Sequence, residues 1–153
     1  MKIARGFTLI EVMVVLIVVA VMASMLKLNV SGKPSAEDEV ERLRLVLEAA
    51  AERAQVRGTP LAVELLPQGY RCSEFDLRGN WTPIRNEPLF AQQDLSGVLA
   101  WHEPRIDGTV APLTLVFGSE MPAFDLEIGM PAGTMHLLSS PTGGVRQRSG
   151  VGS

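Results

Sequence analysis

The sequence predicts an α+β fold in which one long N-terminal helix packs on a C-terminal antiparallel β domain. Three observations lead to this prediction. The chain opens with an apolar run of membrane length, which is followed by a segment whose apolar residues recur at helical spacing. After Gly58 the pattern changes to short apolar or alternating segments separated by glycine and proline turns. With 153 residues, the chain is long enough for one modest domain beyond the apolar run.

The first half of the helix, residues 7–30, has the length and composition of a membrane span. From Phe7 to Leu26 only Thr8, Glu11 and Ser24 interrupt the apolar series, and about 20 such residues suffice to cross the hydrocarbon core. The run is longer than the apolar region of a conventional secretory signal, and no Ala-x-Ala site follows it. The basic leader, residues 1–6, favours an N-terminus on the cytoplasmic side.

Glu11 is the one carboxylate inside this apolar run. An ionisable group near the bilayer centre costs a few kcal/mol on insertion scales, roughly 2.5–3.5. A single charge in low dielectric is costly, whereas a close pair of opposite charges attracts strongly. Glu11 is therefore a candidate functional residue. The alternative is that Glu11 is protonated or solvated by lipid headgroups.

The second half of the helix, residues 31–58, is expected to be amphipathic. Pro34 breaks the preceding helix, and Ser35 with Asp38 forms an N-terminal cap ahead of an acidic first turn. Gly58 and Pro60 mark the C-terminal end. The acidic start, Glu37 to Glu41, is interpreted as a solvated surface, with a contact to basic residues of a neighbouring chain as the alternative. The apolar stripe consists of Val40, Leu43, Leu47, Ala50, Ala51 and Ala54.

Residues 59–153 are expected to form the β domain, because several short strand-like segments there are bounded by turn signals. The expected strands are Leu61–Leu66, Tyr70–Phe75, Val98–His102, Leu113–Phe117, Phe124–Ile128, Thr134–Leu138 and Val145–Arg148. Turn sequences such as Pro67-Gln68-Gly69 and Pro141-Thr142-Gly143-Gly144 lie between them.

The residues that could carry chemistry do not form a catalytic or metal-binding motif in the sequence. His102 and His136 have no ligand spacing to each other or to Cys72. Asp125 and Glu127 alternate with apolar residues, which indicates an outward strand face. No basic stripe interleaved with aromatic residues suggests nucleic-acid binding. We therefore expect no enzyme activity, cofactor or metal.

The single cysteine and the two tryptophans also have structural interpretations. Cys72 cannot form an intramolecular disulfide, so a buried thiol is expected, with an intermolecular bridge or a reactive group as the alternative. Trp81 and Trp101 are expected to pack in the core or on a hairpin; the alternative is a binding surface.

The N-terminal motif Gly6-Phe7-Thr8-Leu9-Ile10-Glu11-Val12 resembles the class III signal of type IV pilins and type II secretion pseudopilins. The resemblance implies cleavage between Gly6 and Phe7 by a prepilin peptidase and N-methylation of the new Phe7 amine. It also implies that Glu11 faces the N-terminal amine of a neighbouring subunit during assembly.

Several later motifs resemble the minor H-type pseudopilins. They are Ala49–Pro60, Gly69-Tyr70-Arg71, Gly79-Asn80-Trp81-Thr82-Pro83, Leu115–Phe124 and Gly143-Gly144-Val145; the hairpin in Leu115–Phe124 departs from the family pattern, because Gly118 directly follows Phe117. This resemblance implies a pilin-like minor subunit of a type II secretion pseudopilus. It would be anchored in the bacterial inner membrane with its C-terminal domain in the periplasm, and would contact lipid and other pseudopilins. The alternatives are a minor pilin of a type IV pilus and a membrane-anchored periplasmic enzyme or binding protein.

Overall fold

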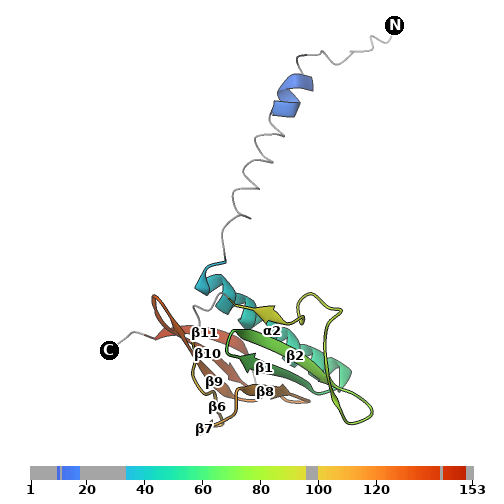
Figure 1. Cartoon of the computed structure of the whole chain (residues 1–153), viewed down its shortest axis with the longest axis vertical. Helices are drawn as coiled ribbons and strands as arrows, with labels where there is room; N and C mark the ends of the chain where they lie inside the picture. Colours follow the sequence, from blue (N-terminus) through green and yellow to red (C-terminus); the bar gives the residue numbers. More distant parts are fainter. Residues whose placement is uncertain (1–9, 11, 18–33, 96–99, 142, 151–153) are drawn as a thin grey trace. The chain divides into compact units, whose positions relative to one another are not determined.

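The computed structural model describes residues 10, 12–17, 34–95, 100–141 and 143–150 (Figure 1). The chain divides into two compact units, Met1–Lys33 and Pro34–Ser153. In the first unit, residue 10 and residues 12–17 are helical. Among the described helices, none is long and apolar enough to cross a membrane. Most of the predicted span of residues 7–30 lies outside the described residues, as do Gly6, Phe7 and Glu11.

Helix α2, Ala36–Arg57, begins and ends where the sequence predicts. The Ser35 hydroxyl accepts a hydrogen bond from the Asp38 amide at 3.2 Å, and the Asp38 carboxylate accepts one from the Ser35 amide at 3.1 Å. This reciprocal pair satisfies two amides at the start of the helix and confirms the predicted cap. At the other end, Gly58 adopts φ 65° and donates its N–H to the Ala54 carbonyl at 2.9 Å, a left-handed conformation that glycine adopts without strain.

The first sheet contains five strands in the order β3-β2-β1-β8, and β4 also pairs with β2. All the pairings are antiparallel. Strands β1 and β2 are joined by the tight turn at Pro67–Gly69 that the sequence predicts. The strands are β1 Leu61–Leu66, β2 Gly69–Phe75, β3 Trp81–Pro83, β4 Gln93–Asp94 and β8 Thr114–Phe117.

The second sheet contains six strands in the order β11-β10-β9-β6-β7, and β5 also pairs with β9. Its pairings are again antiparallel, so the expected antiparallel α+β architecture is confirmed. The strands are β5 Ala100–Trp101, β6 Arg105–Ile106, β7 Thr109–Val110, β9 Phe124–Met130, β10 Gly133–Ser140 and β11 Gly143–Gly150.

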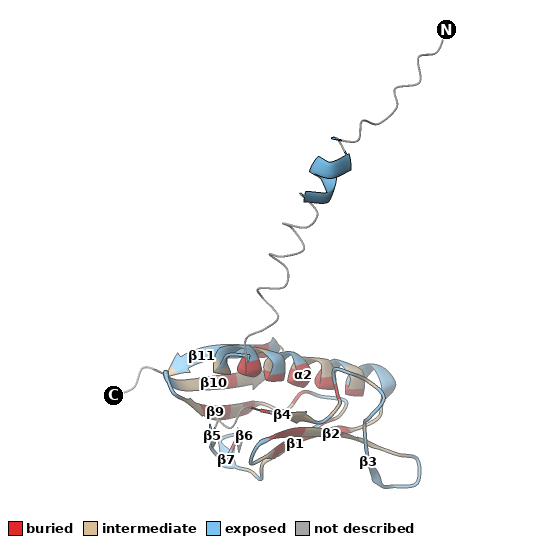
Figure 2. Ribbon diagram, turned by 45° about the horizontal axis from the view of Figure 1, so that its top comes forward, coloured by how far each residue is buried: buried red, intermediate tan, exposed pale blue. Residues whose placement is uncertain are grey.

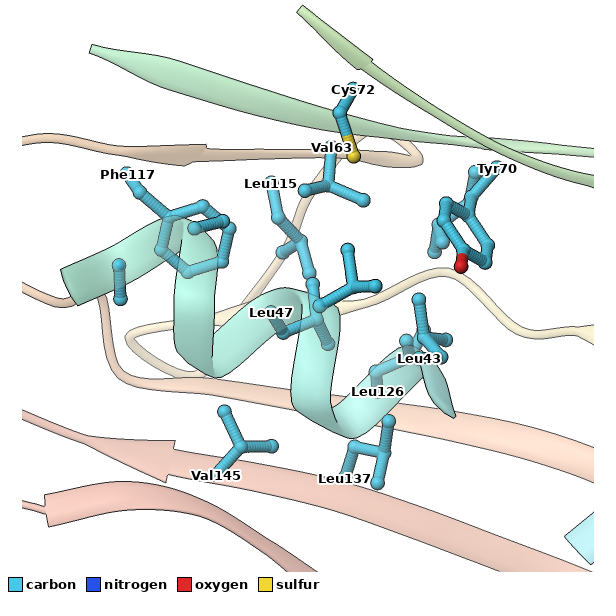
Figure 3. Packing of buried hydrophobic residues seen from close by; sticks show 14 of the residues in the cluster. Leu43, Leu47, Val63, Tyr70, Cys72, Leu115, Phe117, Leu126, Leu137 and Val145 are labelled. Atoms are coloured by element: carbon cyan, nitrogen blue, oxygen red, sulfur yellow. The ribbon is translucent and has the colours of Figure 1, made fainter. Parts of the chain in front are cut away.

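The core lies where both sheets meet α2. The buried side of α2 faces the strands (Figure 2), and Figure 3 shows Val63 and Leu115 on one side of Leu47, with Leu137 and Val145 on the other. All of these side chains are buried. Truncating such a leucine to alanine costs about 2–5 kcal/mol, because a cavity remains. The predicted stripe of α2 is buried in full, and Val46 joins it.

Four short strands, β3, β4, β6 and β7, were not among the expected strands, and one expected strand is observed only in part. Residues 105–110 form the hairpin of β6 and β7, which the sequence interpretation missed. Its turn residues Asp107 and Gly108 both have positive φ, 50° and 79°, and an Asp-Gly pair is a known signal for such a turn. The expected strand Val98–His102 is observed only at Ala100–Trp101, and residues 98 and 99 lie outside the described part.

Candidate functional site and interaction surfaces

The residues predicted to carry assembly chemistry, Gly6, Phe7 and Glu11, lie outside the described part of the chain. Their roles therefore stay predictions. The compact unit of residues 34–153 presents outward faces on both of its sheets.

The outer face of the second sheet carries both histidines. His136 Nδ1 lies 2.9 Å from an Asp125 carboxylate oxygen, and His102 Nδ1 lies 3.8 Å from a Glu127 oxygen. Phe124, Leu126 and Ile128 point into the core, so the predicted outward face of Asp125 and Glu127 is confirmed. Within the described residues, no group of three or more His, Cys, Asp or Glu side chains is arranged to hold a metal ion.

Arginines on other strands of the same sheet lie on either side of these carboxylates. Arg105 on β6 stands opposite Asp125 in register, while Arg146 and Arg148 on β11 stand opposite Leu138 and His136 on β10. Cross-strand neighbours share a face. The result is a surface on which acidic and basic side chains alternate between strands.

The outer face of the first sheet holds a shallow hollow of about 350 Å³. Its lining includes the small residues Ala62 and Ser73 and the larger Trp81 and Val116, which are 45% and 47% exposed. The Glu64–Arg71 ion pair joins two strands beside it. Half-exposed aromatic side chains of this kind are enriched in protein interfaces.

The two tryptophans pack as the sequence analysis expects, on a hairpin and against the core. The Trp81 ring stands edge-on to Phe75 with centroids 5.1 Å apart, which ties β3 to β2. Trp101 packs against the core and donates its indole N–H to the Leu66 carbonyl at 2.6 Å. This bond links the second sheet to the end of β1 in the first.

Cys72 is fully buried, as the sequence analysis expects. Burial raises the pKa of its thiol to about 12, because the thiolate would lose its hydration in the core. The reactive form is the thiolate. Cys72 is thus a structural residue in the folded unit.

The acidic start of α2 is only partly the solvated surface that was expected. Asp38 caps the helix, and Glu41 accepts hydrogen bonds from Arg44 and from Gln147 of β11. Glu39 is 5% exposed and has an interaction partner. The interpretation of Glu39 as solvated was wrong, because its helix position lies on the same buried side as Leu43, Val46 and Ala50.

A charge cluster around Arg53 was missed by the sequence interpretation. Arg53 pairs with Glu74 of β2 at 2.8 Å and also with Glu87 of the β3–β4 connection. Its guanidinium lies 5.2 Å from the centre of the Phe90 ring, a distance typical of a cation–π contact. The hydrogen bond from Arg53 lowers the pKa of Glu87, and hydrogen bonds from Glu87 and Glu74 raise the pKa of Arg53.

Comparison with known proteins gives matches for both units. Residues 1–26 match the model of the prokaryotic N-terminal methylation motif. No curated protein matches the sequence. Two solved structures of the minor pseudopilin EpsH from the type II secretion system of Vibrio cholerae match the fold. In one, the TM-score is 0.61 at 19% identity, over 75% of this chain and 97% of the solved chain. In the other, the TM-score is 0.58 at 16% identity, over 75% of this chain and 99% of the solved chain.

Both matches agree with the resemblance drawn from the sequence motifs. The α2 helix packed on two antiparallel sheets is the expected pilin-like arrangement. The chain carries a prokaryotic N-terminal methylation motif, and its folded unit has the α+β fold of the minor pseudopilin EpsH.

Proposed function

We propose that this chain is a non-catalytic minor pseudopilin of a type II secretion system. The observation that carries the proposal is the combination of a methylation motif at residues 1–26 with an EpsH-like fold in the remaining unit. Neither feature is sufficient by itself. The motif occurs at the start of different filament subunits, and a fold alone does not fix a function.

The proposed processing follows from the first residues. Cleavage between Gly6 and Phe7 by a prepilin peptidase removes Lys2 and Arg5, and methylation modifies the new Phe7 amine. The remaining apolar segment anchors the chain in the inner membrane, with the folded unit in the periplasm. There it contacts other pseudopilins of a short filament that helps to move folded proteins through the outer membrane.

Glu11 supplies the assembly charge in this proposal. A carboxylate in an apolar environment gains most from a cationic partner, because each charge alone loses its hydration. The positive Phe7 amine of a neighbouring subunit is such a partner. The Glu11 carboxylate would then find its partner only on assembly. An unassembled subunit would carry an unpaired charge, and incorporation into the filament would remove that free-energy cost.

The test compares Glu11→Ala with Val12→Ala as the matched control in the same segment. We expect Glu11→Ala to be cleaved normally but incorporated poorly, as measured by crosslinking to the major pseudopilin and by secretion of an exoprotein. Val12→Ala should incorporate like the wild type. Normal incorporation of Glu11→Ala would refute the assembly role. Restoration of piliation rather than secretion in a deletion strain would favour the minor-pilin alternative.

A further inference from the structure

The segment between β3 and β4 leaves the sheet and returns to it. Ile84 donates its amide to the Cys72 carbonyl at 3.0 Å, and β4 pairs again with β2 at Gly69 and Tyr70. Between these two anchors, residues 85–92 cross toward the C-terminal part of α2. We refer to residues 85–92 as the strap.

The strap has few attachments to the rest of the molecule. Phe90 is its only buried side chain, at 5% exposure, and all eight of its positions belong to the described residues. Its described backbone hydrogen bonds are internal, from the Phe90 and Ala91 amides to the Glu87 carbonyl. The other described attachment is the ion pair of Glu87 with Arg53, whose guanidinium also lies over the Phe90 ring.

The pairing of β4 with β2, which fixes the C-terminal end of the strap, depends on glycine at position 69. A Cβ atom at this position would come within 2.0 Å of the Gln93 carbonyl oxygen. Only glycine therefore permits β4 to approach β2 so closely. Because Ile84 is hydrogen-bonded to Cys72 at the other end, both ends of the strap are fixed to β2, and any movement is confined to residues 85–92.

The Arg53–Glu87 ion pair also separates two surface hollows. One, of about 680 Å³, includes Phe75, Ile84 and Glu74 in its lining; the other, of about 290 Å³, includes Ala49, Val56 and Leu89. Arg53 and Glu87 line both.

We propose that the strap opens as a local unit while the two sheets and α2 stay folded, and that the Arg53–Glu87 pair with Phe90 holds it closed. Segments with few buried apolar contacts and few tertiary hydrogen bonds open first in folded proteins. The strap has one buried side chain and one half-exposed ion pair, whereas β1 and β2 are joined by an unbroken ladder of six residue pairs. This inference does not depend on the proposed function.

The test is limited proteolysis of the full chain in detergent micelles with trypsin, scored at Arg85 in the strap and at Arg78 in the β2–β3 turn. The rate at each site is divided by that of the same bond in an unfolded peptide of identical sequence. Glu87→Gln removes the ion pair, and Phe90→Leu weakens the apolar anchor. Glu64→Gln is the control, because it removes an Arg–Glu pair that joins only β1 and β2.

Glu87→Gln should raise the normalised rate at Arg85 about three- to fivefold, as expected for one partly exposed ion pair. Phe90→Leu should raise it about tenfold, and neither variant should change the rate at Arg78. Glu64→Gln should change neither site. The proposal is overturned if Arg85 is unaffected in both variants, if Arg78 accelerates equally, or if wild-type Arg85 is cut as fast as in the peptide.

Discussion

Two arginines on α2 each pair with two glutamates, but one pairs within the helix and the other pairs with other elements. Arg44 pairs with Glu41 and Glu48, three and four residues away on the same helix, both at 2.9 Å. Arg53 pairs with Glu74 and Glu87, which lie 21 and 34 residues away on other elements. The Arg44 side chain is 20% exposed and that of Arg53 is 11% exposed.

The difference shows how the same pair of residue types can support a helix or join a tertiary fold. Arg44 stabilises its own helix, with one further bond to the Val145 carbonyl at 3.3 Å. Arg53 connects α2, β2 and the strap, and it is nearly buried. Losing Arg44 leaves two well-exposed carboxylates on one helix, whereas losing Arg53 removes the cation that joins Glu74, which is 28% exposed, and Glu87 to α2.

The largest expected effect comes from Arg53→Ala. We expect a loss of about 2 kcal/mol in unfolding free energy, between the values typical of exposed and of fully buried ion pairs. Urea unfolding of the full chain in micelles, followed by tryptophan fluorescence, measures it. A loss under about 0.5 kcal/mol would mean that the cluster is energetically equivalent to a surface pair.

Arg44→Ala should cost less, about 0.5–1 kcal/mol, because pairs at i,i+3 and i,i+4 contribute a few tenths each. The same urea experiment compares the two variants directly. A cost equal to that of Arg53→Ala would remove the distinction between local and tertiary pairing. The bond to Val145 would then have to carry more than its 3.3 Å length suggests.

The capping of α2 could be predicted from sequence, while the tertiary contacts of Arg53 could not. Ser35, Asp38 and Gly58 act within a few residues of themselves, so their roles follow from spacing. The Arg53 partners depend on how the β3–β4 connection returns to α2, which no local pattern encodes. The β6–β7 hairpin is different, because the pair Asp107-Gly108 is a known hairpin-turn sequence. It was missed because its two strands have only two residues each and show no alternating pattern.

The acid dependence of stability should differ between wild type and Glu87→Gln. The Arg53 hydrogen bond lowers the pKa of Glu87 below its usual range. A lowered carboxyl pKa stabilises the folded state above the unfolded pKa, and this contribution is lost as the pH falls through the folded value. The difference in urea midpoint between the two proteins should therefore be constant near neutral pH and shrink below about pH 4. A difference that grows on acidification would contradict the sign of the shift.

Salt should have the smallest effect on stability, and the size of this effect should differ between the Arg44 and Arg53 variants. Screening weakens exposed charge pairs more than buried ones. Raising the ionic strength from about 0.1 to about 1 M should reduce the cost of Arg44→Ala proportionally more than that of Arg53→Ala. Equal proportional reductions would indicate that Arg53 is as hydrated in solution as Arg44.

The central claim concerns the N-terminus, because the proposed function begins with its processing. The most direct measurement is intact mass and N-terminal peptide mass spectrometry of the chain expressed with and without a prepilin peptidase. We expect loss of residues 1–6 and one added methyl group on Phe7 only when the peptidase is present. An intact Met1 in both cases, or cleavage after the apolar run, would contradict the proposed processing.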